Sequence, residues 1–257
     1  MAARRHISRP LVSARVLVGH RRSWGSDYVL AVILAVIAGA SNAGGFFALG
    51  EYTSHMTGYL SRIADNLVAG QLLVVGTALL AIASFASGAA FTALLVNWAR
   101  WRMGRRQYAL PLAVQGACLA CFAFGGVFTT PTGRLFALAC LCFIMGMQNA
   151  TITKISGARI RTTHATGMIT DIGIESGRAI YGLLRRDGRV RADPTKLRIL
   201  LTLVTSFVTG GVVGAIGYSV AGFYFSLPLA AALLALSLPA LVTRPRRASA
   251  GLPASRV

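Results

Sequence analysis

Five long segments of the chain carry no charged residue, and the charged residues gather between them. The uncharged segments are residues 29–50, 66–99, 107–133, 135–153 and 199–243. An α-helix rises about 1.5 Å per residue, so about 20 residues cross a hydrocarbon core of roughly 30 Å. The pattern therefore predicts several membrane-spanning helices.

The two longest segments need a further decision. Residues 199–243 are about twice as long as one crossing requires, so we expect this segment to fold back near residues 219–223 and form two spans. Residues 66–99 have two interpretations, which are one long tilted span with interfacial ends or a tight hairpin around residues 84–88. We favour the single span, which gives six spans in total.

The composition of the chain also indicates a membrane protein. Hydrophobic residues make up 55% of the chain and charged residues only 13%, whereas a soluble domain carries about 25% charged residues. The 26 Lys and Arg residues outnumber the 7 Asp and Glu residues, for a net charge of +19. In a soluble protein this balance would indicate nucleic-acid binding. Here it is better explained by membrane topology, and no nucleic-acid partner is expected.

The basic residues cluster in residues 1–27, 100–106, 154–196 and 243–257. With six spans and both termini cytoplasmic, all four clusters face the cytoplasm, as the positive-inside rule requires. Splitting residues 66–99 into two spans would instead place the arginines of 100–106 opposite the N-terminal tail. The first apolar segment is longer than the 7–15 residues of a signal-peptide core. We therefore expect the basic tail to be retained and to face lipid headgroups.

Two short blocks occur twice in the chain. Gly-x-x-Asn-Ala stands at residues 39–43 and again at residues 146–150, an offset of 107. His-x-Thr-Gly stands at residues 55–58 and again at residues 164–167, an offset of 109. The pattern predicts an internal duplication.

The duplication predicts the fold and its domains. We expect an all-α polytopic membrane protein with about six transmembrane helices in two three-helix repeats, at residues 28–128 and 135–242, between basic cytoplasmic tails at residues 1–27 and 243–257. Three spans per copy would insert the second copy in the opposite orientation. Many secondary transporters consist of such inverted repeats, with the solute site near the midplane between them.

The repeated blocks supply the candidate site residues. Asn42 and Asn149 share a helix face with a glycine and an alanine, which fits either a helix–helix contact or the lining of a solute path. The His-x-Thr-Gly segments suit either a re-entrant helix lining a wet cavity or an interfacial amphipathic helix. Further along, Arg62 aligns with Asp171 and Asn66 with Glu175, so we expect an Arg62–Asp171 charge pair across the repeat axis. The predicted substrate-binding residues are Asn42, His55, Thr57, Arg62, Asn149, His164, Thr166, Asp171 and Glu175.

Other chemistry has little support in the sequence. Four cysteines lie in the predicted spans, at Cys118, Cys121, Cys140 and Cys142. Although Cys-x-x-Cys can indicate redox or zinc chemistry, small packing residues are the better interpretation. The chain has no catalytic motif, so we expect no enzyme, cofactor or metal site. Small-residue motifs such as Gly210-x-x-x-Gly214 fit packing within the chain or a homodimer.

These residues also carry a family resemblance. The segment from Asn42-Ala43 to Ser54-His55-Met56-Thr57-Gly58, followed by Met145-Gly146-Met147-Gln148-Asn149-Ala150 and Arg161-Thr162-Thr163-His164-Ala165-Thr166-Gly167, resembles the YoaK family. That is a family of bacterial inner-membrane proteins with a domain of unknown function. The resemblance covers about residues 28–242 and implies a multi-pass inner-membrane protein. The chain departs from the family pattern at Tyr59 and Met168.

Two functions remain open. The first is a small-solute transporter or permease with a polar site at the repeat interface, in contact with the bilayer and an unknown solute. The second is a non-transporting scaffold or stress-related protein that recruits a partner through its basic cytoplasmic loops. A lipid-modifying enzyme acting through His55 or His164 is a distant third.

Overall fold

The computed structural model describes residues 24–103, 108–124, 130–156, 165–185 and 190–242, and every regular element in these ranges is a helix. This confirms the expected all-helical fold class. The chain order is α2 (Trp24–Leu49), α3 (Met56–Val68), α4 (Leu72–Met103), α5 (Ala109–Phe122), α6 (Pro131–Ser156), α7 (Ala165–Arg185), α8 (Pro194–Ala221), the 3-10 helix η3 (Gly222–Phe225) and α9 (Ser226–Val242).

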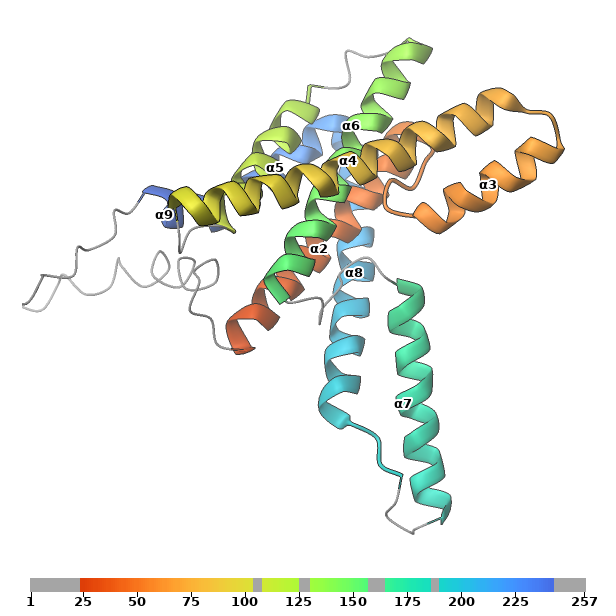
Figure 1. Ribbon diagram of the computed structural model, residues 1–257, viewed down its shortest axis with the longest axis vertical. Coiled ribbons are helices and arrows are strands. Elements are labelled where there is room, and N and C mark those ends of the chain that lie inside the picture. The colour runs from red at the N-terminus through yellow and green to blue at the C-terminus, as the bar shows by residue number, and fades with distance from the viewer. Residues whose placement is uncertain (1–23, 104–107, 125–129, 157–164, 186–189, 243–257) are drawn as a thin grey trace, which may run out of the picture.

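Six helices form a central body (Figure 1). Within it α2 packs chiefly against α8, α4 against α6, and α5 against α9. The core is aliphatic, with fully buried side chains such as Leu34, Leu112 and Leu141. Because lipid tails are as apolar as leucine, these helices gain little from burial alone. Close packing must therefore hold the body together.

Glycines allow the long helices to touch at their crossings. A Cβ atom added to Gly39 of α2 would collide with the carbonyl oxygen of Phe207 in α8, and one added to Gly88 of α4 would collide with that of Phe143 in α6. Only a residue without a Cβ permits this backbone approach, which brings many atoms into dispersion contact. The two crossings therefore depend on glycines at the points of contact.

Four stretches of the described chain are long and apolar enough to cross a membrane: Tyr28–Leu49, Leu72–Arg102, Pro131–Lys154 and Pro194–Val242. The fourth stretch covers α8, η3 and α9. The apolar helix α5 has 14 residues, fewer than the about 20 that a crossing requires. Separate crossings by α5 and α9 remain predictions.

The structure agrees with the two predictions about the longest apolar segments, which were a single helix without a hairpin around residues 84–88 of the segment 66–99 and a break near residues 219–223 of the segment 199–243. Helix α4 runs without interruption from Leu72 to Met103, so no hairpin forms around residues 84–88. The segment 199–243 breaks at Gly222, where α8 ends with a φ of 56° and η3 begins. That backbone angle is one that glycine adopts readily and other residues rarely do.

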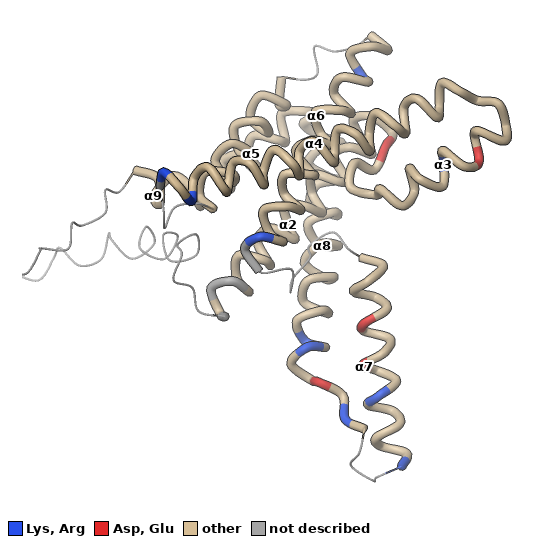
Figure 2. Tube along the Cα trace, viewed as in Figure 1, with Lys and Arg blue, Asp and Glu red and all other residues tan. Residues whose placement is uncertain are grey.

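Two helical arms extend from the body. The first arm is α3 with the N-terminal half of α4, and the second arm is α7 with the N-terminal half of α8. Figure 1 shows the arms on different sides of the molecule. Figure 2 shows the described charged residues toward the ends of the long helices and on the arms. The candidate site residues therefore divide between the body and two separate arms.

Candidate functional site

The chain between α2 and α3, residues 50–55, folds back along α2. Its Ser54 donates two hydrogen bonds to Asn42 Oδ1, from the backbone nitrogen at 3.1 Å and from Oγ at 2.9 Å. Asn42 lies seven residues before the end of α2, which is about 10 Å along the helix axis. One amide thus holds a non-helical connection about two turns inside a candidate membrane span.

The same connection lies directly on the backbone of α2. A Cβ atom at Gly45 would approach the Glu51 carbonyl oxygen to 2.7 Å, and the Glu51 amide donates to the Gly45 carbonyl at 3.3 Å. The buried hydroxyls of Thr53 and Ser41 have no hydrogen-bond partner in the described structure. Buried polar groups are normally paired with protein or with water. Both hydroxyls are fully buried, so they add polar groups to the packed interior beside this connection.

Glu51, Tyr59 and Arg62 form the first polar cluster, where this connection meets α3. Arg62 makes an ion pair with Glu51 and lies 5.8 Å from the centre of the Tyr59 ring. The hydrogen bond to Glu51 raises the pKa of Arg62 above its ordinary value. Burial is the main cause of a raised pKa for the Tyr59 hydroxyl. The cluster therefore holds a fixed charge pair beside a neutral phenol.

His55 and Thr57 lie at the start of α3 and are both exposed. His55 is the N-cap residue, and its side chain makes no capping hydrogen bond. Its imidazole instead packs against Gly58, where an added Cβ would collide with the ring. The glycine of the first His-x-Thr-Gly block thus makes room for its histidine.

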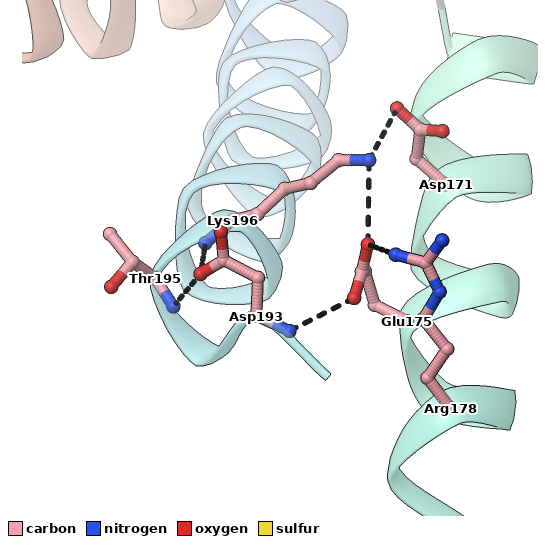
Figure 3. A network of polar contacts seen from close by, with 6 residues as sticks. All are labelled: Asp171, Glu175, Arg178, Asp193, Thr195 and Lys196. Atoms are coloured by element: carbon pink, nitrogen blue, oxygen red, sulfur yellow. Dashed lines mark hydrogen bonds and ion pairs between the residues drawn. The ribbon is translucent and has the colours of Figure 1, made fainter. Parts of the chain in front are cut away.

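A second polar cluster joins α7 to α8 (Figure 3). The Glu175 side chain is only 1% exposed; it accepts from Arg178 Nη1 at 3.0 Å and from the Asp193 backbone nitrogen at 3.0 Å. Lys196 Nζ lies 3.5 Å from Glu175 Oε1 and 3.6 Å from Asp171 Oδ2. The backbone hydrogen bond from Asp193, aided by the nearby cations, lowers the pKa of Glu175. The carboxylate is therefore held in its charged form.

Asp193 also starts α8. Its Oδ1 accepts from the backbone nitrogens of Thr195 at 2.9 Å and Lys196 at 3.0 Å, and Pro194 occupies the first helical position. Both features are typical of helix N-termini, because they satisfy or remove backbone donors that have no partner within the helix. The cap places Lys196 one turn into α8, facing the carboxylates of α7 (Figure 3).

The expected Arg62–Asp171 pair does not form. Arg62 of α3 is paired with Glu51 of the connection between α2 and α3, and Asp171 is paired with Lys196 within the second arm. The arms lie on different sides of the molecule, so the two residues occupy corresponding positions without meeting. Arg62 consequently lies in the first polar cluster and Asp171 and Glu175 in the second, while His55 lies at the start of α3 against Gly58.

The remaining predicted residues lie as follows. Asn149 is buried in α6, where Nδ2 donates to the Met145 carbonyl at 3.0 Å. Thr166 is exposed in the first turn of α7, and its carbonyl accepts from the Thr170 hydroxyl at 2.9 Å. His164 lies outside the described residues.

Sequence reasoning missed a buried amide relay at the centre of the body. Gln115 Nε2 of α5 donates to Gln148 Oε1 of α6 at 3.0 Å, and Gln148 Nε2 donates to the Leu34 carbonyl of α2 at 2.6 Å. Both side chains are fully buried, and Gln115 Oε1 has no partner within the described structure. The available signal was an uncharged polar residue inside an apolar segment, which is costly in a membrane unless it is paired.

Within the described ranges, no group of three or more His, Cys, Asp or Glu residues is arranged to hold a metal ion. The four cysteines are free thiols in the body helices α5 and α6. What the described site offers is hydrogen bonding from amides and hydroxyls, and two charge clusters.

Comparisons with known proteins place the chain in a family. No curated protein and no solved structure matches it. The model of a family of proteins of unknown function, DUF1275, matches residues 30–239. These residues span all the described helices from the first turns of α2 to near the end of α9, and the match is consistent with the resemblance seen in the sequence. The chain therefore belongs to the DUF1275 family, as a helical membrane protein of unknown function.

Proposed function

We propose that this protein is a small-solute transporter or permease of a bacterial inner membrane, built from two inverted three-helix repeats. The non-helical connection at residues 50–55 carries the proposal. It lies beside a candidate span, held by Asn42, with two buried hydroxyls unpartnered. Non-helical backbone at membrane depth occurs where it is buried in protein or lines a wet cavity. Interrupted helices of this kind form the solute sites of many transporters.

The packing of the long helices supports the repeat. The first helix of each proposed repeat packs on the long helix of the other, which gives the α2–α8 and α6–α4 pairs. In both pairs a glycine of one helix meets a carbonyl oxygen of its partner, and the residues at the two crossings correspond. The corresponding residues are Gly39 and Gly146, Val36 and Phe143, Phe85 and Phe207, and Gly88 and Gly210.

The two polar clusters fit a gating role. In an inverted arrangement the first arm opens toward one side of the membrane and the second arm toward the other. The Glu51–Arg62 ion pair ties α3 of the first arm to the connection from α2, and the Asp171–Lys196 ion pair ties the two helices of the second arm to each other. Alternating access needs one closure on each side of a central site. The clusters supply two such closures, and the buried Gln115–Gln148 relay lies between the repeats.

Site-directed cysteine labelling tests this proposal. On a background in which the native cysteines are replaced by alanine, Thr57→Cys and Thr166→Cys would each be treated with a membrane-impermeant maleimide from either side, with and without a panel of metabolites. In a transporter that alternates between two open states, one of the two cysteines should become accessible to the maleimide as the other becomes inaccessible. A transported solute should therefore raise labelling at one position and lower it at the other. Ser219→Cys, at an exposed position near the C-terminal end of α8, should not respond.

The scaffold hypothesis gives the opposite result. The end of α7 exposes Leu183 and Leu184 beside Arg185, which is a surface a partner protein could recognise. A scaffold should show constant labelling at Thr57→Cys and Thr166→Cys with every solute. It should instead lose partner binding when Arg185 and Arg191 are neutralised.

A further inference from the structure

A large apolar cavity lies between α4, α5 and α6, apart from the polar clusters. Its volume is about 590 Å³, which falls within the range of about 300–1,000 Å³ that is typical of small-molecule sites. No charged residue lines it. The polar atoms of its wall are the hydroxyls of Ser84 and Ser87 and the thiols of Cys118, Cys121 and Cys140.

The cavity follows from the way its three helices meet. Helices α4 and α6 touch at their crossing, where Gly88 meets the Phe143 carbonyl, and they separate on either side of it. On α5 three of the five facing residues are small, Ala117, Cys118 and Cys121, and they lie between Val114 and Phe122. Small side chains on α5 cannot fill the space between two diverging helices, so a wedge stays open beside the crossing.

The wall chemistry selects the occupant. The cavity residues belong to the candidate spans and to α5, so hydrocarbon surrounds the opening. The Ser87 hydroxyl already donates to the Ser84 carbonyl in its own helix, at 2.8 Å. Apolar cavities do not hold water, and an empty one forfeits dispersion contacts along its whole lining. An apolar chain from the surrounding bilayer meets all of these conditions.

We propose that this cavity binds a single acyl chain of a bilayer lipid. The chain enters between α4 and α5 and lies against the small residues of α5, with Phe136 and Phe143 of α6 on its other side. The site contains none of the residues assigned to solute transport. Whether or not lipid binding is found at this cavity, the proposed transporter function is tested separately.

A photoreactive lipid tests the site in the wild-type protein. The protein would be placed in lipid nanodiscs with a trace of phosphatidylcholine that carries a diazirine in one acyl chain, and crosslinked peptides would be mapped by mass spectrometry. We expect crosslinks concentrated on residues 114–122 and 136–144, with labelling there reduced at least severalfold by excess free palmitate. Equal labelling of the exposed apolar faces of α4, α8 and α9, without competition, would show ordinary annular lipid and overturn the proposal.

A pair of variants sharpens the result. Ala117→Trp places a large ring in the cavity from an exposed position on α5, and should reduce crosslinking of the cavity residues about tenfold. Val213→Trp adds the same ring to the exposed face of α8 and should leave that crosslinking unchanged. Crosslinks between two copies of the chain at residues 114–122 would mean that a second protomer covers the cavity, which also contradicts the proposal. The wild-type mapping decides the matter if Ala117→Trp does not fold.

Discussion

At the scale of single residues, the buried relay of Gln115 and Gln148 ties three helices together. Gln148→Leu removes the acceptor of Gln115 Nε2 at a site with no access to water. Leaving a buried polar group unpaired costs about 1–3 kcal/mol, so we expect a loss of stability of that size in a detergent unfolding assay. The double variant Gln115→Leu/Gln148→Leu should be less destabilised than the sum of the two single variants. Full additivity would argue against the relay.

Glu175 gives a prediction about pH. Its pKa is held below the ordinary value of 4.5 by the Asp193 amide and the neighbouring cations. The carboxylate therefore stabilises the fold above the unfolded pKa, and this contribution is lost as the pH falls through the folded pKa. We expect wild type to melt at a higher temperature than Glu175→Gln at pH 7, with the difference shrinking below about pH 4.5.

The control for this titration is Asp65→Asn, a change of the same kind on the exposed surface of α3. Its melting temperature should follow that of wild type more closely than Glu175→Gln does at pH 7. A difference between wild type and Glu175→Gln that stays constant down to pH 3 would rule out the proposed role of the charged carboxylate.

The sequence predicted individual polar residues better than their partners. Repetition singled out Asn42 and His55, and Asn42 does hold the connection to α3. An aligned repeat, however, identifies residues that occupy equivalent positions, and equivalent positions in two arms need not touch. That is why Arg62 pairs with Glu51, an acidic residue eleven positions away in the chain, rather than with Asp171.

At the scale of helices, Gly88 is one of two glycines that allow the close crossing of α4 and α6, the other being Gly146. Gly88→Ala should lower stability by about 1–3 kcal/mol, because the added methyl group overpacks a backbone contact. Gly76→Ala lies on the same helix with nothing within 4 Å of its Cβ position. That variant should be neutral or slightly stabilising, since alanine favours helix more than glycine does. Similar melting temperatures for the two variants would mean that α4 and α6 do not cross at Gly88.

The corner between α8 and α9 depends on another glycine. Gly222 ends α8 with φ 56° and ψ −142°, and the Tyr218 hydroxyl bonds to Ser226 Oγ across the corner at 2.8 Å. A side chain in this backbone region costs about 1–3 kcal/mol. We expect Gly222→Ala to show that loss in thermal unfolding, while Gly173→Ala, in the open on α7, does not. An unchanged Gly222→Ala variant would indicate a different corner conformation.

Apolar length predicted the long helices and the break in the longest apolar segment, at Gly222, but not where every helix ends. The uncharged segment that begins at residue 66 contains the end of α3, a turn at Gly70 with φ 69°, and only then α4. Charge marks the limit of a membrane span, whereas a turn depends on local backbone angles. The length of the arms could not be predicted for the same reason.

At the scale of the whole molecule, two hydrogen bonds show which helix ends lie on the same face of the body. Arg134, at the start of α6, donates to the Leu49 carbonyl at the end of α2. Tyr108, just before α5, donates to the Lys154 carbonyl near the end of α6. Since α6 runs from one face of the body to the other, the end of α2 and the start of α5 lie on opposite faces. This agrees with a chain that crosses the membrane an odd number of times between them.

The excess of basic residues then predicts which face of the body lies on the cytoplasmic side of the membrane. Arg100 and Arg102 lie in the last turn of α4, next to the start of α5, and the positive-inside rule predicts that this end faces the cytoplasm. We expect alkaline phosphatase inserted after Gly70 or Thr130 to be active, and the same enzyme fused after Met103 or Val242 to be inactive. Green fluorescent protein at the four positions should give the reverse pattern. If insertions after Gly70 and after Met103 reported the same side, α4 could not be a single membrane span, and the inverted-repeat arrangement would be lost with it.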